Sequence, residues 1–338
     1  MKAFGQHSSK LARDMVLLAR LYVRNRHPPA DNPENVKNLG FVKGRELLDA
    51  AQSILTSDEL SVGSMESDIE GDSDLGNVYH YTGMLDMFEF FPSRNFDQLD
   101  NAIVNAERAI AVWDSTENPK AKADTLNLLG SLNMHKGMSG TGGHKMLMKA
   151  ESLLKESLAL RETILSRTDP DLGQVLNTLG DFYTKQGNLP DAEGYYHRAR
   201  RVYVEGLGPR HTRGVFPLIG LATLEELRPE KDFALMIRYW EQVVSIRKQL
   251  GDKNPQYQQS FDKLRKARQQ QFIQQNAATR ISRLWKKLKT AAREGGASGA
   301  DGNRLVESTT PGECTRNWHT HARARAHTHM AAVAMDRF

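Results

Sequence analysis

The chain has 338 residues, of which 39% are hydrophobic and 26% charged, and its mean hydropathy of −0.57 suits a soluble, helix-rich protein. Its single cysteine excludes an intramolecular disulfide framework and cysteine-rich zinc sites, so a reducing compartment is expected. No apolar run approaches the roughly 18 residues that a membrane-spanning helix requires. The net charge of +5 is unevenly spread, because ten Lys and Arg residues and no acidic residue lie between Lys263 and Arg293.

The amino-terminal part predicts two helices joined by a proline-rich loop. The first thirty residues contain Asp14 as their only acid, a composition that is also typical of a transit peptide. We favour a structural role, in which a helix begins at Lys10 and packs against a partner helix. An acidic linker over residues 57–74 is expected after the partner helix. The expected core residues of the two helices are Leu18, Ala19, Tyr22, Gly44, Leu48 and Ala51.

Two further pairs of helices are predicted before residue 170. Their facing sides again combine small and large residues at a helical period. An aromatic insertion, Phe88-Glu-Phe-Phe-Pro92, separates the helices of the earlier pair. The expected contacts are Leu75, Gly76, Tyr79, Ala102, Ala106 and Ala109 in that pair, and Leu129, Gly130, Ala150, Leu154 and Ser157 in the next.

The stretch from Asp171 to Gly208 is the clearest of these pairs. Gly180 removes a side chain where a neighbouring helix comes close, Gly187 is expected at the end of the first helix, and Pro190 in the first turn of the second. The residues expected to pack are Val175, Leu176, Leu179, Phe182, Tyr183, Ala192, Tyr195, Tyr196, Ala199 and Val202. Such a pair cannot bury its own apolar face and needs copies of itself on either side.

A constant spacing connects this pair with its neighbours. The residues separated by 42 positions are Ala150 and Ala192, Gly180 and Ala222, and Ala192 and Ala234. A fifth pair therefore has Leu221, Ala222, Ala234 and Tyr239 as its contacts. The small residues of the two helices lie 12 positions apart in the last two pairs, but 25, 26 and 20 apart in the first three. We expect these insertions along one edge of a repeat stack, as longer helices or as an accessory surface.

The consensus positions of a tetratricopeptide repeat are occupied by Leu179, Gly180, Tyr183, Gly187, Ala192, Tyr196 and Ala199, and the chain resembles that family. Its 42-residue spacing is longer than the usual 34 residues and is similar to that of kinesin light chains. Residues 150–165 resemble the second helix of those repeats. Asn133 and Glu225 depart from the pattern, since an aromatic residue is usual there. The resemblance implies an all-α solenoid over residues 10–251, with about five helix pairs.

Function in such a solenoid is expected on the concave surface lined by the first helices. Asn127 and Asn177 each lie two residues before a leucine, and an amide can pair with both the N–H and the C=O of an extended peptide. In kinesin light chains, asparagines at this place hold the backbone of a cargo peptide, so the resemblance implies the same role here. The alternative is that one solvated asparagine per helix is ordinary. Asp181 and Lys185 are expected to face the same way and to complete the peptide site.

A helix is also predicted after the repeats, over residues 256–293. Its early residues Tyr257, Phe261 and Leu264 are expected to cap the apolar end of the fifth pair. Its later part resembles an IQ motif, with Ser282 in place of the glutamine. The residues expected to contact a calmodulin-like partner are Ile281, Leu284, Trp285, Lys286 and Leu288.

A basic amphipathic helix of this kind suits calmodulin, an anionic membrane surface or RNA. A capping helix with a charged, solvated end is the alternative. Trp285 favours a partner, because an indole ring is costly to leave in water.

Other motifs predict no site. Gly143 stands where a phosphate-binding loop requires lysine. The His-rich segment 319–329 belongs to a tail, residues 294–338, that we expect to be disordered. Cys314 has no candidate base near it in the sequence. We expect no metal, no cofactor and no catalysis, because the sequence contains no carboxylate pair, triad or nucleophile elbow.

These patterns together predict a non-catalytic adaptor or scaffold that binds an extended peptide or a partner helix in the groove of the solenoid. A calmodulin-binding scaffold is the second hypothesis, and RNA binding through the same helix the third. The expected location is the cytoplasm, with a cytoskeletal or ciliary setting suggested by the resemblance. We expect no DNA partner and no membrane span, and we recognise no heptad-rich segment that could join a kinesin heavy chain.

Overall fold

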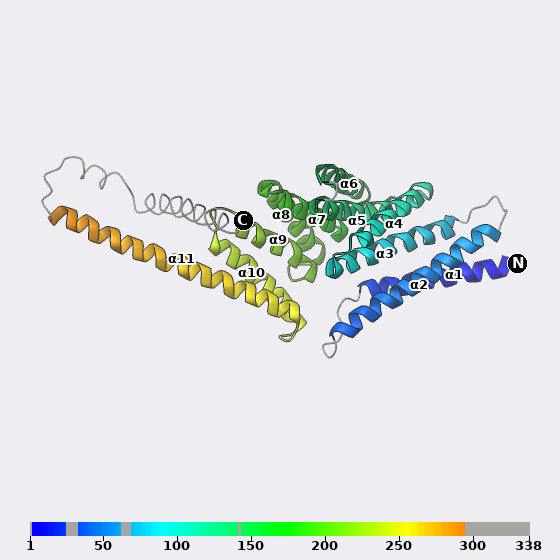
Figure 1. Ribbon diagram of the computed structural model, residues 1–338, viewed down its shortest axis with the longest axis horizontal. Helices are drawn as coiled ribbons and strands as arrows, with labels where there is room; N and C mark the ends of the chain where they lie inside the picture. The colour runs from blue at the N-terminus through cyan, green and yellow to red at the C-terminus, as the bar shows by residue number, and fades with distance from the viewer. Residues whose placement is uncertain (1, 25–32, 62–68, 141–142, 295–338) are drawn as a thin grey trace, which may run out of the picture. The chain divides into compact units, whose positions relative to one another are not determined.

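The computed structural model describes residues 2–24, 33–61, 69–140 and 143–294, and the regular elements within these ranges are all helical (Figure 1). The chain divides into two compact units, Met1–Ser260 and Phe261–Phe338. The tail with Cys314 and the His-rich segment lies outside the described residues. Residues 25–32, which include most of the predicted proline-rich loop, also lie outside them.

The first unit contains five successive pairs of helices, each pair in contact with the next. The first helices α3, α5, α7 and α9 also neighbour one another in chain order. This arrangement confirms the predicted all-α repeat solenoid. The pairs are α1 (Lys2–Arg24) with α2 (Pro33–Ser61), α3 (Ile69–Ser93) with α4 (Phe96–Ser115), α5 (Pro119–Met138) with α6 (Gly143–Ile164), α7 (Pro170–Gln186) with α8 (Leu189–Leu207), and α9 (Val215–Leu227) with α10 (Phe233–Arg247).

Short polar caps mark where the central helices begin. The side chains of Asn118, Asp169 and Asn188 each accept a hydrogen bond from a backbone N–H in the first turn, and a proline follows each cap within two residues. Such a cap stabilises a helix by about 1 kcal/mol. At the other end of α7, Gly187 adopts a left-handed conformation with φ of 78°, which permits the tight connection to α8.

The second helices share one buried stripe at positions i, i+4, i+7 and i+11, which is the period of a single helix face. The stripes are Gly44, Leu48, Ala51 and Leu55 in α2, Ala102, Ala106, Ala109 and Trp113 in α4, Ala150, Leu154, Ser157 and Arg161 in α6, and Ala192, Tyr196, Ala199 and Tyr203 in α8. In α10 the equivalent residues are Met236, Trp240 and Val243. The prediction for Ala234 was therefore wrong, because Ala234 is exposed and the longer connection 228–232 shifts the register by two residues.

Two other register predictions were also wrong. In α3 it is Gly83, not Gly76, that lies against the start of the second helix, because a Cβ on Gly83 would be 3.1 Å from the carbonyl oxygen of Ala102. Gly76 is instead covered by the ring of Trp113. In α1 the side chain of Leu18 is 45% exposed, and Ala12, Val16 and Ala19 form the buried face.

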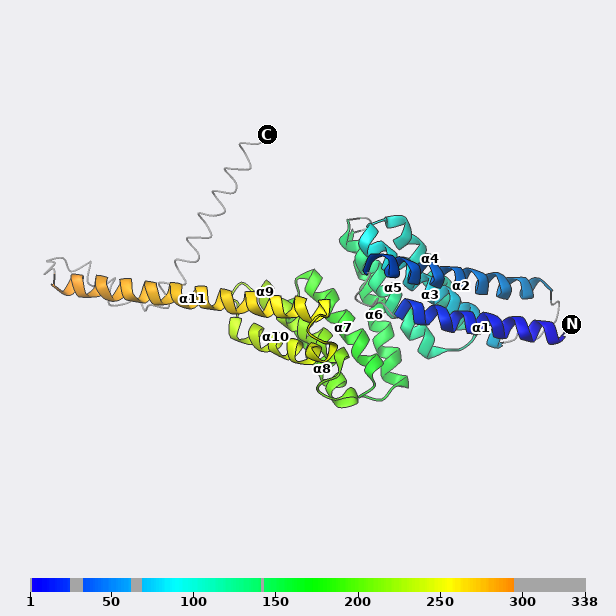
Figure 2. The same ribbon diagram turned by 90° about the horizontal axis from the view of Figure 1, so that it is seen from below.

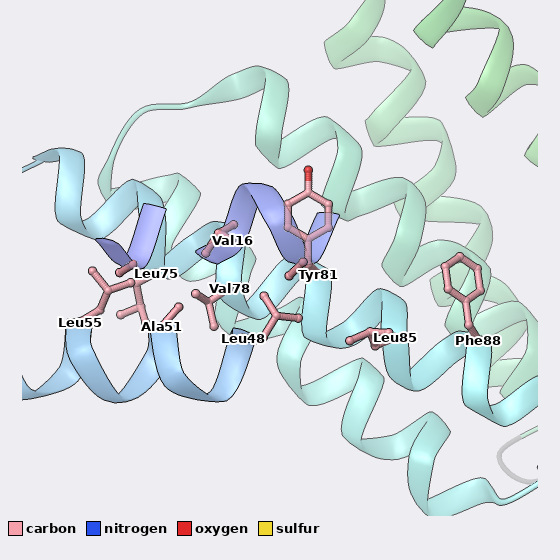
Figure 3. Packing of buried hydrophobic residues seen from close by; sticks show 11 residues of the cluster. Val16, Leu48, Ala51, Leu55, Leu75, Val78, Tyr81, Leu85 and Phe88 are labelled. Carbon is pink, nitrogen blue, oxygen red and sulfur yellow. The ribbon is translucent and has the colours of Figure 1, made fainter. Parts of the chain in front are cut away.

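The helices α1, α2 and α3 share one apolar core, to which α1 contributes Val16, α2 Leu48 and Leu55, and α3 Val78 and Leu85 (Figure 3). The amino-terminal helix is thus part of the repeat array. The predicted insertions are accommodated as longer helices, since α3 has 25 residues against 17 in α7 and 13 in α9.

The predicted acidic linker is largely helical. Residues 57–61 continue α2, residues 69–74 begin α3, and residues 62–68 lie outside the described ranges. Asp74 is buried, and its carboxylate accepts a hydrogen bond from Arg13 Nε at 3.0 Å, which offsets the cost of burying the charge. The carboxylate of Asp86 is likewise buried and lies 2.6 Å from Arg45 Nη2, which ties α2 to α3.

The helix α11 (Pro255–Glu294) is continuous over its 40 residues (Figure 2). Its start belongs to the first unit, where Arg247 donates hydrogen bonds to the backbone oxygen of Gln256 and to Ser260 Oγ, at 3.1 and 2.7 Å. Further along, Leu264 is buried but Phe261 is 44% exposed, so Phe261 is not the covered residue that was predicted. Within the described ranges, no helix combines the length and apolar character needed to cross a lipid bilayer.

Replacing Gly180 by alanine is expected to destabilise the fold. The added methyl group would lie 2.5 Å from Tyr196 Cε1, and such overpacking costs about 1–3 kcal/mol. We expect a lower midpoint of urea unfolding. The matched control is Gly194→Ala, since Gly194 is exposed on α8 with nothing within 4 Å, and it should gain about 0.5–1 kcal/mol. A midpoint for Gly180→Ala at or above that of the wild type would contradict this packing.

Candidate functional site

The predicted site residues lie on matching stripes of α5 and α7. Asn177, Asp181 and Lys185 are spaced by four residues along α7, and 50 positions earlier Asn127, Ser131 and His135 have the same spacing along α5. Residues four apart share one face of a helix, and the two helices are neighbours. The two stripes therefore form one surface, which we call the first-helix face.

Asn127 and Asn177 are both short of hydrogen-bond partners. Asn127 is 6% exposed, and its Oδ1 is buried without a donor among the described residues. In Asn177, Nδ2 donates to Asp181 Oδ2 at 3.3 Å, while Oδ1 is again buried and accepts no hydrogen bond from the described chain. Two equivalent amide oxygens in successive pairs thus lack the partner that buried polar atoms normally have.

Asp181 is held in place by the second helix of its own pair. The hydroxyl group of Tyr196 donates a hydrogen bond to Asp181 Oδ1 at 2.6 Å. Burial raises the pKa of Asp181 above its usual range, although the hydrogen bond from Tyr196 opposes this effect. Asp181 therefore positions Asn177, because its second oxygen accepts from the amide.

The flanking helices do not continue the asparagine pair. The equivalent residue of α3 is His80, whose Nδ1 lies 2.9 Å from Thr125 Oγ1. The equivalent residue of α9 is Ile219, which has no polar group. The two amides are thus confined to α5 and α7.

A group of basic residues lies at the far end of the same surface, formed by Arg94, His135 and Lys185, and we call it the basic cluster. His135 packs edge-on against Phe91, with ring centroids 5.0 Å apart, and its ring lies 6.5 Å from that of Phe90. The guanidinium of Arg94, which directly follows α3, lies 5.9 Å from the centre of the Phe90 ring. Burial, reinforced by the charges of Lys185 and Arg94, lowers the pKa of His135 to about 4.

The sequence predicted Lys185 as a site residue, but not Arg94 or His135. The signal for His135 was present, because it follows Asn127 by the same eight residues that separate Lys185 from Asn177. Arg94 had no comparable signal, since its place depends on the extra length of α3.

The predicted residues of α11 are not all alike in their surroundings. Ile281 and Trp285 are partly buried, whereas Lys286 is exposed and Leu284 is 60% exposed. The side chain of Leu288 lies outside the described part of the chain. Leu284 is thus the apolar residue of this group that is open to solvent.

No metal site is formed by the described side chains, because no three His, Cys, Asp or Glu residues gather there in a suitable group.

One part of the chain matches a known family. Residues 172–213 match the tetratricopeptide repeat family model. This segment, which contains α7 without its first two residues and all of α8, is therefore similar to a tetratricopeptide repeat. Among curated proteins, no sequence is significantly similar to this chain.

Two solved structures of the TPR-like repeats of a candidate kinesin light chain from Podosopora anserina are similar to this chain. One of them, a point variant of that protein, has 16% identity, covers 72% of this chain and 97% of its own, and gives a TM-score of 0.48. The other has 16% identity, coverage of 73% and 99%, and a TM-score of 0.46. BtubC (BKLC) from P. vanneervenii has 14% identity, coverage of 80% and 90%, and a TM-score of 0.39.

The partly buried His135 should make stability depend on pH. Its pKa of about 4 in the fold lies below the unfolded value of about 6.5, so the unfolded chain binds more protons between these values. The free energy of unfolding should fall as the pH is lowered from 7 to 5, by up to about 2 kcal/mol more in the wild type than in His135→Gln. Urea unfolding at both pH values measures this, and an equal loss in the two proteins would contradict it.

Proposed function

We propose that the chain is a non-catalytic adaptor that binds an extended peptide across the first-helix face. The observation that carries this proposal is the pair of equivalent amides, Asn127 and Asn177, whose oxygens lack a donor within the described chain. A peptide backbone offers both the donor and the acceptor that an amide side chain needs.

The spacing of the two asparagines suits an extended ligand. Neighbouring packed helices lie about 8–10 Å apart, which corresponds to roughly three residues of an extended strand. A chain that crosses α5 and α7 could therefore meet Asn127 and Asn177 with backbone groups three residues apart. Because both amide oxygens are buried, each amide must turn about χ2 to present its oxygen to the ligand.

The setting of this adaptor is also a proposal. The 42-residue spacing resembles that of kinesin light chains, and the names of the similar solved structures agree with that resemblance. We infer a cytoplasmic role, in which the chain joins a peptide-bearing cargo to the cytoskeleton or to a cilium.

The double variant Asn127→Ala and Asn177→Ala should lose peptide binding. Peptides would first be selected on the purified wild-type protein from a random library, and their affinity then measured by fluorescence polarisation. If each asparagine makes about two hydrogen bonds of 0.5–1.5 kcal/mol, affinity should fall by about thirtyfold or more.

The control for this experiment is Asn101→Ala, because Asn101 is an exposed asparagine on the second helix α4. It should bind the selected peptides as the wild type does. Thermal unfolding of all variants tests whether the fold is kept. Unchanged affinity in a folded double variant would rule out the asparagine pair as the peptide site.

The second candidate function is calcium-dependent binding of calmodulin by α11. It is favoured by Leu284, which is 60% exposed and is flanked by four exposed basic residues. An exposed apolar residue among cations is typical of helices that enter the apolar groove of calmodulin. The basic residues are Arg280, Arg283, Lys286 and Lys287.

Trp285→Glu should abolish calmodulin binding if this second function is correct, because a carboxylate cannot enter an apolar groove without a large desolvation cost. A pull-down with immobilised calmodulin in calcium and in chelator measures the effect. The control is Phe272→Glu, a change at a 63% exposed residue outside residues 277–289, which should leave binding intact. Absence of calcium-dependent binding by the wild type would remove this function and leave an anionic membrane or RNA as the remaining partners.

A further inference from the structure

The basic cluster contains two cations that have no ion-pair partner within the described residues. Arg94 and Lys185 form no ion pair and donate no side-chain hydrogen bond within the described residues. Other lysines nearby are paired, since Lys136 lies 2.6 Å from Asp100 and Lys149 lies 2.8 Å from Glu107. Arg94 and Lys185 differ from these two lysines in having no carboxylate partner within the described residues.

The three residues of the cluster come from three successive pairs. Arg94 follows α3, His135 lies on α5 and Lys185 on α7, and these helices neighbour one another in that order. Arg94 and His135 both lie near the ring of Phe90, and His135 also contacts Phe91. Burial lowers the pKa of Lys185, the charge of Asp181 raises it, and the charge of Arg94 lowers it.

The carboxylate nearest in sequence to Lys185 is already engaged. Asp181 accepts hydrogen bonds from Tyr196 and Asn177, at 2.6 and 3.3 Å, and is partly buried. It attracts Lys185 electrostatically, but it forms no ion pair with it in the described structure. An incoming anion could therefore be held by Arg94 and Lys185 without displacing an ion pair.

We propose that the basic cluster binds the phosphate of a phosphorylated residue in the peptide ligand. Arg94 and Lys185 supply two positive charges, and a phosphate monoester carries about −1.5 to −2 at neutral pH. Arginine can donate two hydrogen bonds to phosphate oxygens, lysine adds a further charged donor, and the neutral His135 ring adds an N–H. A carboxylate, with one charge, would leave one of the cations unpaired.

The place of the cluster fits the proposed peptide site, on which this inference rests. His135 and Lys185 follow the two asparagines by eight residues, about 12 Å along a helix. A ligand that turns to run along the helix axis beyond the asparagines would cover that distance in three or four extended residues. The phosphorylated residue would thus stand a few positions from the residues held by Asn127 and Asn177.

The test uses the full chain and inorganic phosphate as the probe. The imidazole proton signals would be followed by NMR during titration with phosphate and with acetate at constant ionic strength, with the His135 signal assigned from His135→Gln. We expect a saturable shift of this signal with phosphate and none with acetate. Arg94→Gln and Lys185→Gln should each weaken phosphate binding by about tenfold or more.

The matched control is Lys149→Gln, which removes an exposed lysine on α6 and should leave the phosphate titration unchanged. The double variant Asn127→Ala and Asn177→Ala should also bind phosphate normally, so that a failure of the peptide site and a failure of the phosphate site can be told apart. A shift with phosphate that does not saturate, an equal shift in the Arg94 and Lys185 variants, or equal binding of acetate would each overturn the proposal.

Discussion

The contact on which the central repeats depend is that of the Tyr196 ring with two glycines. A Cβ on Gly180 would lie 2.5 Å from Tyr196 Cε1, and one on Gly220 would lie 2.4 Å from the same atom. The ring therefore occupies space that any side chain would fill in both α7 and α9. Because the hydroxyl group of Tyr196 also donates to Asp181, this contact fixes the spacing of the helices and the position of Asn177 together.

Other pairs replace aromatic packing by polar contacts. One position of the first helices lies three residues after the small residue that faces the second helix. In α7 this position is Tyr183, three residues after Gly180. The equivalent residues of α3, α5 and α9 are the buried polar residues Asp86, Asn133 and Glu225. Each has a hydrogen bond, since Asp86 accepts from Arg45, Asn133 donates to the carbonyl oxygen of Leu129, and Glu225 accepts from Arg228. Burying a polar group without a partner costs roughly 1–3 kcal/mol, so these bonds make the departures from the consensus tolerable. They also make each pair specific to its place in the stack.

The sequence predicted the fold correctly because small and large residues recur at helical spacing around a constant period. It failed where two small residues share one helix face. Gly76 and Gly83 are seven residues apart, so both lie on the inner side of α3, and only their contacts with Trp113 and Ala102 distinguish them. The prediction that Ala234 is buried failed because the 42-residue spacing does not reveal the longer connection before α10. For the site, the spacing selected Asn127 and Asn177, whose peptide-binding role stays a prediction, but it could not find Arg94, which joins the site through packing between pairs.

The restriction of the two amides to α5 and α7 bears on how a ligand would be selected. Backbone hydrogen bonds hold any extended peptide equally well, so two asparagines give affinity with little choice of sequence. Selectivity must then come from side chains beside them. The basic cluster has residues from three successive pairs on the first-helix face. Arg94 belongs to it because the aromatic insertion lengthens α3, which Arg94 directly follows. The insertion that departs most from a regular repeat is thus the part of the array that brings Arg94 to the surface where a ligand would be distinguished.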